Sequence, residues 1–219
     1  MNAPLAALLS DLDGTLVDGE RLWADAHAEV ARQLGGELTA AELDALVGVD
    51  LDVSVATLCA TVAHPPHPDE VRGLLLDAVA AGYRDGYAPP MPGALDLLNL
   101  LAAVGVPVAV VTSTVRPLAE LAIARLGRHR FAAVVCGDEA GATKPDPHPY
   151  RRAAQLLGVD PRACLAVEDS PTGVLSAHRA GAPVLAVPGA LPVRAMPGCT
   201  VRAGLVGITL DEIAAARAA

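Results

Sequence analysis

Five short apolar runs, separated by segments of helical periodicity, constrain the fold of this chain more than any other feature. Runs of this length and composition are typical of strands buried on both faces of a parallel sheet. They are Ala6–Ser10, Val106–Thr112, Ala132–Cys136, Cys164–Val167 and Val184–Val187. Between them, apolar residues recur at helical spacing, as at Leu118, Leu121 and Ala122. This alternation predicts an α/β fold, a Rossmann-like three-layer sandwich around a parallel sheet.

One interval breaks this alternation. The first run ends near Asp11 and the second near Thr112, a separation far longer than an ordinary crossover. The intervening stretch carries helical patterns, and the proline-rich residues 87–93 are typical of a linker that returns to the sheet. We therefore predict an inserted all-α cap domain, and the expected boundaries are 1–18 and 91–219 for the α/β core domain and 19–90 for the cap.

Composition and charge narrow the function classes. Hydrophobic residues make up 53% of the chain, enough for a substantial core, yet no apolar run reaches the ~18 residues of a membrane span. The net charge is −9 without a dense basic cluster, which argues against nucleic-acid binding because that binding depends on Lys and Arg. The amino terminus lacks a basic segment followed by a long apolar stretch, so we expect no signal peptide and a cytoplasmic location. We also expect no membrane partner and, by default, a monomer.

Polar side chains that could carry chemistry cluster where the predicted strands end. Ligands of open parallel sheets bind beyond the carboxyl ends of the strands, so residues at these ends share one edge of the sheet. The candidates are Asp11 and Asp13 after the first run, Thr112 and Ser113 after the second, Lys144 after the third, and Glu168 and Asp169 after the fourth. The sequence therefore predicts a single site built by four segments.

The first of these clusters indicates a metal. Asp11 and Asp13 are spaced i, i+2, so they project from one side of an extended chain, and Gly14 lets the backbone turn close to a ligand. Burying like charges together is costly, so we expect a cation to neutralise them. Hard oxygen ligands favour Mg²⁺ over a soft metal.

Residues 11–18 read Asp-Leu-Asp-Gly-Thr-Leu-Val-Asp. This octapeptide resembles the first motif of the haloacid dehalogenase (HAD) superfamily, most of whose members are Mg²⁺-dependent phosphohydrolases. The three later clusters match the other motifs of that family in order and in strand-end context. The resemblance covers nearly the whole chain in the core motifs.

The resemblance implies a role for each cluster. Asp11 would be the nucleophile that forms an aspartyl-phosphate, and Asp13 the general acid/base. Thr112, with the amide of Ser113, would hydrogen-bond the transferring phosphoryl oxygens. Lys144 would hold the nucleophile and the phosphate electrostatically.

The resemblance also implies a metal shell. Asp169 would bind Mg²⁺ directly and Glu168 through water, while Asp11 and the backbone carbonyl of Asp13 would complete the protein's ligands. Gly14 counts among the phosphate-binding positions, because a glycine lets the backbone come close to the ligand.

Structural interpretations compete with these roles, because helix caps and turns use the same residue types. Each later cluster taken alone could be a cap or a surface turn; only their order and placement favour a site. For Arg116 we expect a solvated arginine at a helix start rather than a phosphate-binding group, and for Asp138 a place in a turn rather than in the site. The six histidines show no metal-ligand spacing and are expected at the surface or in local hydrogen bonds.

The predicted insert resembles the C1 cap of the HAD subfamily that includes β-phosphoglucomutase and small sugar- or polyol-phosphate phosphatases. A lid of this kind excludes water and supplies contacts for specificity. β-Phosphoglucomutases carry a histidine where this chain has Trp23, and a cap arginine whose aligned region, residues 47–51, offers no cation here. The loss of both groups favours simple hydrolysis over a mutase.

Our leading hypothesis is a Mg²⁺-dependent phosphatase that acts on a small-molecule phosphate ester, such as a phosphorylated sugar or polyol. A β-phosphoglucomutase-like phosphotransferase is the alternative among enzymes. A dehalogenase would leave Glu168 and Asp169 without a purpose, because that chemistry needs no metal. A catalytically silent binding or regulatory protein of the same fold is the alternative outside enzymes.

Overall fold

The computed structural model describes residues 4–189 and 191–218. The chain divides into two compact units, which are Met1–Val17 with Pro90–Ala219, and Asp18–Pro89. The first is an α/β unit and the second is helical. No helix among the described residues is long and apolar enough to cross a membrane.

The α/β unit is built around a six-stranded sheet in which every neighbouring pair of strands is parallel. The strand order is β3-β2-β1-β4-β5-β6, so β1 lies in the centre, and its Leu9 pairs with Ala109 on one side and Ala166 on the other. The strands are β1 (Leu8–Ser10), β2 (Val108–Val111), β3 (Ala133–Val135), β4 (Leu165–Glu168), β5 (Val184–Ala186) and β6 (Cys199–Val201). The predicted α/β fold with a parallel sheet is confirmed.

The sixth strand was not predicted. Cys199–Val201 has three residues, lies at the edge of the sheet beside β5 and becomes progressively exposed along its length. An edge strand of this kind needs no continuous apolar run, so the signal that revealed the five central strands is missing here.

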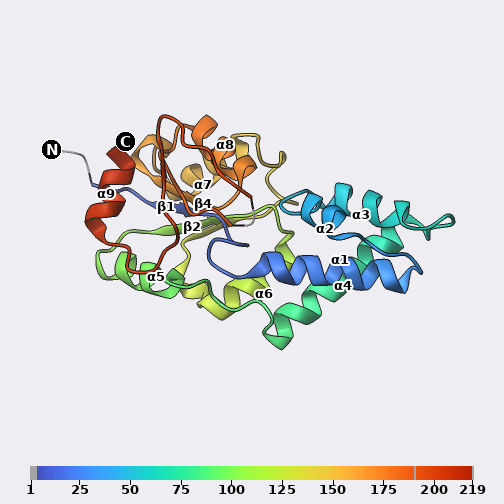
Figure 1. Cartoon of the computed structure of the whole chain (residues 1–219). Coiled ribbons are helices and arrows are strands. Elements are labelled where there is room, and N and C mark those ends of the chain that lie inside the picture. Colours follow the sequence, from blue (N-terminus) through green and yellow to red (C-terminus); the bar gives the residue numbers. More distant parts are fainter. Residues whose placement is uncertain (1–3, 190, 219) are drawn as a thin grey trace. The chain divides into compact units, whose positions relative to one another are not determined.

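Helices cover both faces of this sheet. Figure 1 shows α7 and α8 on one face and α5 and α6 on the opposite face. Helix α7 packs against β1, β2 and β3, while α8 and α9 pack against β4 and β5. The helices are α5 (Ala94–Ala103), α6 (Arg116–Leu126), α7 (His148–Leu157), α8 (Pro171–Ala180) and α9 (Leu210–Ala218), with 3₁₀ turns η1 (Arg128–Arg130) and η2 (Pro161–Ala163).

Side-chain alternation along the strands decides which helices the site faces. Leu9 and Ala166 belong to the buried cluster that includes Tyr150 of α7. Successive residues of a strand point to opposite faces, so Asp11 and Glu168, two positions further on, point to the same side as that cluster. The α7 side of the sheet is therefore the side on which the first and fourth strands deliver their acidic residues.

The helical unit consists of helices packed through close contacts. Its described elements are α1 (Gly19–Gln33), α2 (Ala40–Ala45), α3 (Leu51–Ala60) and α4 (Pro68–Asp85). Helix α1 packs against α4, and Gly82 leaves the space that the Leu22 side chain fills, because a Cβ at Gly82 would collide with it. A capping box between Thr39 and Glu42 starts α2, and Gly86 in the left-handed conformation ends α4.

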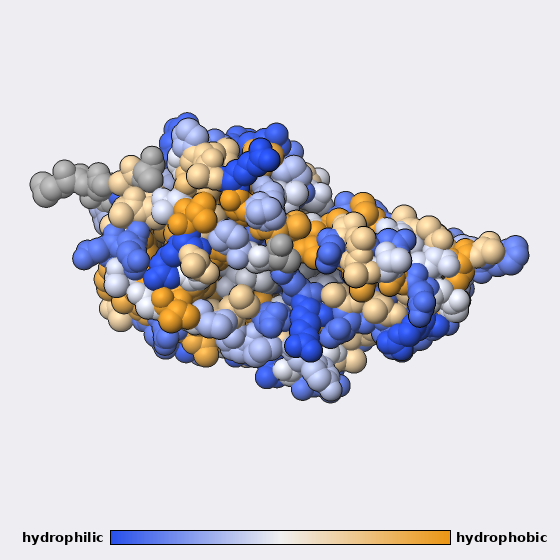
Figure 2. All heavy atoms as spheres, in the orientation of Figure 1, coloured by the Kyte–Doolittle hydropathy of each residue, from blue (hydrophilic) through white to orange (hydrophobic). Residues whose placement is uncertain are grey.

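Hydrophobic and hydrophilic residues are mixed on the surface that Figure 2 shows. The large apolar side chains that remain exposed, such as Tyr87, Leu156 and Val206, come from separate parts of the chain. Scattered exposure of this kind is ordinary for a folded protein and marks no particular function.

Candidate active site

The carboxyl ends of β1 and β4 and the loop after β3 bring three charged side chains into direct contact. The Lys144 ammonium lies 2.6 Å from Asp11 Oδ1 and 2.6 Å from Glu168 Oε1. All three are almost fully buried, and the Lys144 side chain is only 5% exposed. Lys144 is also the only lysine of the sequence. A compact ammonium suits a position between two carboxylates better than the planar guanidinium of arginine.

Glu168 is held on both of its oxygens. Tyr150 donates its hydroxyl to Oε1 at 2.5 Å, which Lys144 also contacts, and Ser170 Oγ donates to Oε2 at 3.1 Å. Gly173 of α8 faces the carboxylate, and any Cβ at this position would collide with it. The Glu168 side chain therefore has one fixed position in the buried interior.

Three carboxylates could hold a metal ion. Asp11, Glu168 and Asp169 each place an oxygen within 4.8 Å of the others, and all three residues are buried. Asp11 Oδ2 is buried and accepts no hydrogen bond from the described residues, which is an unusual state for a buried oxygen. Because the oxygens of Glu168 are already engaged, Asp11 and Asp169 are the better direct ligands. An all-carboxylate set fits a hard cation such as Mg²⁺.

Burial and pairing set the charges of this group. Burial raises the pKa of Asp11 to about 7, although the nearby Lys144 opposes the shift. For Lys144, burial favours the neutral amine, but the attraction of Asp11 and Glu168 outweighs it and raises its pKa. Burial and the neighbouring Glu168 charge raise the pKa of Tyr150 well above its usual value, so its hydroxyl remains a donor. The lysine therefore keeps its charge inside the protein.

Asp13 and Thr112 are linked through a residue that the sequence did not single out. Thr114 donates its hydroxyl to Asp13 Oδ2 at 2.8 Å, and its backbone N–H donates to Thr112 Oγ1 at 3.0 Å. Ser113 between the two threonines is exposed. Gly14 has a φ of 82°, which only glycine adopts readily, and its N–H closes a turn onto the Val17 carbonyl.

The structure thus brings Asp11, Lys144, Glu168 and Asp169 together and ties Asp13 to the Thr112 segment. Three further residues, Tyr150, Thr114 and Gly173, take part and were missed. Tyr150 was not among the predicted site residues. Its hydroxyl could have pointed to a polar contact in the sequence, because a tyrosine on a buried helix face needs a hydrogen-bond partner.

One expectation needs correction, and it concerns Arg116. It does stand at the start of α6, but it is only partly exposed to solvent, and its guanidinium contacts Glu139, Glu120 and the Val134 carbonyl. Asp138 accepts the backbone N–H of Arg116 and so caps the helix. These contacts hold the start of α6 against the end of β3, so Arg116 has a structural role.

His27 of the helical unit meets the second part of the expectation for the histidines, a local hydrogen bond. It is 3% exposed rather than at the surface, and its Nε2 has no hydrogen-bond partner among the described residues. Burial lowers its pKa to about 4, against the opposing effect of a backbone hydrogen bond with Trp23. The ring is therefore buried in its neutral form.

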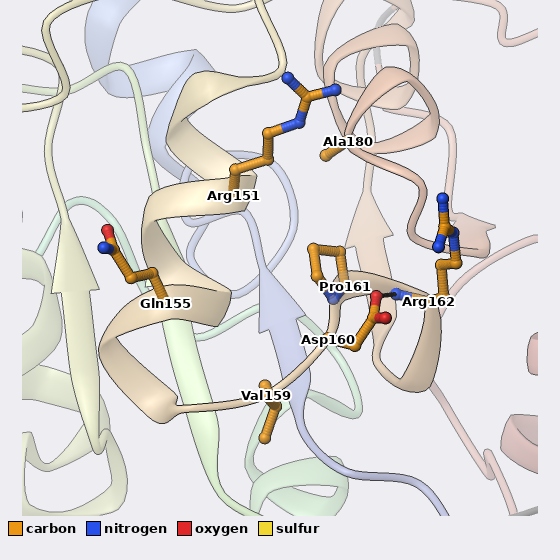
Figure 3. A pocket seen from close by; sticks show the side chains of 7 residues that line it. All are labelled: Arg151, Gln155, Val159, Asp160, Pro161, Arg162 and Ala180. Carbon is orange, nitrogen blue, oxygen red and sulfur yellow. Dashed lines mark hydrogen bonds between the residues drawn. The ribbon is translucent and has the colours of Figure 1, made fainter.

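A surface pocket lies elsewhere in the α/β unit. Residues of α7, η2 and the end of α8 line it, and Figure 3 shows Arg151 and Gln155 on one helix and Arg162 beyond Pro161. None of the predicted site residues lines it. Its arginines are exposed, and η2 precedes β4, so the pocket is separate from the strand ends that carry the acidic cluster.

Comparison with known proteins identifies the family. Residues 5–181 match the model of a hydrolase family, haloacid dehalogenase-like hydrolase. The chain is 34% identical over 182 residues to validoxylamine A 7'-phosphate phosphatase from Streptomyces hygroscopicus subsp. limoneus, covering 79% of this chain and 81% of that protein. Hexitol phosphatase A from Escherichia coli (strain K12) is 32% identical over 196 residues, or 82% of this chain and 81% of that protein. Among solved structures, CbbY from Rhodobacter sphaeroides in complex with phosphate aligns with a TM-score of 0.83 at 26% identity, covering 93% of this chain and 96% of the other.

The chain therefore belongs to the haloacid dehalogenase-like hydrolases. The family and the enzyme class, a HAD-type phosphatase, are confirmed as predicted from the octapeptide and the clusters that follow it. The buried cluster of Asp11, Glu168 and Asp169 is consistent with the metal site that was expected.

Proposed function

We propose that this chain is a Mg²⁺-dependent phosphomonoester hydrolase that acts through an aspartyl-phosphate on a small phosphorylated sugar, polyol or related metabolite. The observation that carries the proposal is the buried contact of Lys144 with both Asp11 and Glu168, beside Asp169. A cation held against a carboxylate at a parallel-sheet edge is suited to a nucleophile that meets an anionic phosphate.

In the first step, an oxygen of Asp11 attacks phosphorus and forms a new P–O bond. The bond between phosphorus and the ester oxygen breaks, and its electron pair goes to the leaving oxygen. Asp13 donates a proton to that oxygen, so an alcohol leaves. The hydrogen bond from Thr114 fixes the orientation of the Asp13 carboxyl for this transfer.

In the second step, water attacks the phosphorus of the aspartyl-phosphate. Asp13, now ionised, takes a proton from the water, and the bond between phosphorus and Asp11 breaks. Inorganic phosphate is released and both carboxyls return to their starting states. In both steps, we assign the binding of the phosphoryl oxygens to Lys144, Thr112 and the amide of Ser113. Gly14 lets the backbone come close to the phosphoryl group.

We assign the metal to Asp11 and Asp169, with the backbone carbonyl of Asp13 as a further ligand and Glu168 acting through water. When bound, Mg²⁺ supplies positive charge to a phosphoryl oxygen. Asp11 Oδ2, which is buried and has no hydrogen-bond partner in the described part of the chain, supports this assignment.

The substrate class rests on the relatives and on the cap. The two relatives described above are phosphatases named for a hexitol and for validoxylamine A 7'-phosphate, and the similar CbbY structure contains phosphate. We assign residues 19–90 as the cap that selects the leaving group and residues 1–18 with 91–219 as the catalytic core. The absence of a cation in the sequence of residues 47–51 favours hydrolysis over phosphotransfer.

The test is a phosphate-release screen of the purified protein over hexitol phosphates, other polyol phosphates and sugar phosphates, with Mg²⁺ and after chelation. We expect release that requires Mg²⁺ and that is lost in Asp11→Asn. Asp211→Asn, the same change at an exposed position of α9, is the matched control and should retain full activity. Isomerised phosphosugar without free phosphate would instead identify a phosphotransferase, and release that survives chelation would reject the metal assignment.

A further inference from the structure

Tyr150 is a buried group that the mechanism above leaves unused. It is 0% exposed, and its hydroxyl donates to Glu168 Oε1 at 2.5 Å. Its ring lies beside Lys144, whose ammonium is 5.5 Å from the ring centroid. Tyr150 therefore contacts Glu168 and Lys144. The hydrogen bond described for its hydroxyl goes to Glu168 and not to Asp11 or Asp169.

The hydroxyl of Tyr150 and the ammonium of Lys144 share one acceptor. Both donate to Glu168 Oε1, and the same ammonium lies at an equal distance of 2.6 Å from Asp11 Oδ1. The position of a cation between two carboxylates depends on how much of each negative charge other donors already satisfy. Tyr150 satisfies part of the charge of Glu168, which leaves the ammonium available to Asp11.

The surroundings hold Tyr150 and Glu168 rigidly. Tyr150 belongs to the core cluster together with Ala153 and Ala154 of α7, so its ring is fixed by packing against the sheet. On the other side, Ser170 binds the second oxygen of Glu168, and Gly173 leaves just enough room for the carboxylate. The geometry is that of a fixed acceptor with a fixed donor on either side.

We propose that Tyr150 is a positioning residue for the phosphatase reaction: its hydroxyl, bound to Glu168 Oε1, keeps the Lys144 ammonium directed at Asp11 and at the phosphoryl group. This inference rests on the proposed function for its kinetic consequence. Without the hydroxyl, Glu168 draws the ammonium towards itself, and the charge that develops in the transition state loses part of its stabilisation.

The first test is kinetic. Tyr150→Phe removes only the hydroxyl, and we expect kcat to fall by about 10- to 100-fold, as is common when the partner of a site residue is lost, with KM changed less than about threefold. Inhibition by vanadate, which imitates the phosphoryl group in transfer, should weaken in parallel with kcat. Ile123→Val, which removes a buried methyl group from α6, is the control for a loss of packing alone and should leave kcat, KM and vanadate inhibition unchanged. A Tyr150→Phe enzyme with the kcat of the wild type would overturn the inference.

A second test does not depend on activity. Because Lys144 is the only lysine, protein labelled with ¹⁵N-lysine gives one side-chain ammonium NMR signal, and it belongs to this residue. Tyr150→Phe should shift that signal and speed its hydrogen exchange, whereas Ile123→Val should not. An unchanged signal would overturn the inference, even if no phosphate ester proves to be a substrate and the proposed function itself fails.

A double-mutant cycle tests whether Tyr150 acts through Glu168. If Tyr150 acts through Glu168, its loss adds nothing once Glu168→Gln has removed the charge that attracts the ammonium. We expect the double variant to have the kcat of Glu168→Gln alone, within about twofold. A double variant whose losses multiply would show that the two residues act separately and would overturn the inference.

Discussion

The two units of this protein bury polar groups in opposite ways. In the α/β unit, the Lys144 ammonium is buried as a charge and contacts the buried carboxyl groups of Asp11 and Glu168 at 2.6 Å each. In the helical unit, His27 is buried as a neutral ring, with its Nε2 lacking a partner among the described residues. Buried charges are tolerated only when they are paired, whereas a neutral imidazole needs only to avoid protonation.

This difference indicates that the reactive groups lie in the α/β unit. A paired, buried cation beside a carboxylate costs desolvation energy, and such a cluster is typical of a site where charge is needed for a reaction. The neutral His27 contributes no charge, and its consequence is a pH-dependent stability. Changes in the α/β unit should therefore act first on turnover, and changes at His27 should act on stability.

The largest effect is expected for Lys144→Met, which removes the cation but keeps much of the apolar stem. Loss of the ammonium takes electrostatic stabilisation from the transferring phosphoryl group, so phosphate release should fall by about 10²- to 10³-fold. Steady-state kinetics with the best substrate of the screen measures this. Lys144→Arg should not restore the rate, because the guanidinium fork does not fit between the two carboxylates. Full activity in either variant would break the assignment of Lys144 to the reaction.

The next effect concerns the metal. Asp169→Asn removes one charge from the carboxylate cluster, and the Mg²⁺ concentration for half-maximal activity should rise about 100-fold. Calorimetric titration of Mg²⁺ gives the same comparison without a substrate. Asp211→Asn serves again as the control at an exposed carboxylate. Equal Mg²⁺ affinity in Asp169→Asn and wild type would exclude Asp169 as a ligand.

A pair of glycines in helices sharpens the comparison between the units. A Cβ at Gly173 of α8 would collide with the Glu168 carboxylate, whereas one at Gly73 of α4 meets nothing within 4 Å. Gly173→Ala should lower the free energy of unfolding by about 1–3 kcal/mol, because a packed interior does not accept added volume. Gly73→Ala should raise it by about 0.5–1 kcal/mol, since alanine favours the helix. Denaturant unfolding measures both, and equal values for the two variants would contradict the fixed position of Glu168.

The last prediction concerns the pH dependence of stability that His27 contributes. Its pKa falls from 6.5 to about 4 in the folded protein, so the unfolded chain binds more protons between these values. The neutral buried ring therefore makes its full contribution to the free energy of unfolding above pH 6.5, and this contribution declines as the pH falls towards 4. Between pH 7 and pH 5 this amounts to about 2 kcal/mol.

His27→Leu should remove that dependence, so the stability difference between pH 7 and pH 5 should shrink by about the same amount in denaturant unfolding. His64→Gln, at an exposed position of the same unit, is the control and should leave the dependence unchanged. A wild-type pH profile in His27→Leu would show that the ring is not buried in neutral form.

The sequence predicted that Asp11, Glu168 and Asp169 share one edge of the sheet because they lie at the ends of parallel strands. Lys144 lies in the loop after β3, so its contacts with Asp11 and Glu168 were visible only in the structure. Parallel strands end at one edge, so a residue's place after an apolar run defines its place in the site. The same reasoning could not reach Tyr150 or Gly173, whose importance depends on what lies opposite them in space. Strand β6 was not predicted for a related reason: a strand at the edge of the sheet does not need a continuous apolar run.

The central claim is that Asp11 attacks phosphorus, and trapping the covalent intermediate tests it most directly. The enzyme is mixed with substrate and Mg²⁺, quenched with acid during turnover, treated with borohydride and digested for mass spectrometry. Borohydride reduces an acyl phosphate to the alcohol, so the account predicts homoserine at position 11 and at no other aspartate. Homoserine at another carboxylate, or an unmodified Asp11 in an enzyme that is releasing phosphate, would contradict it.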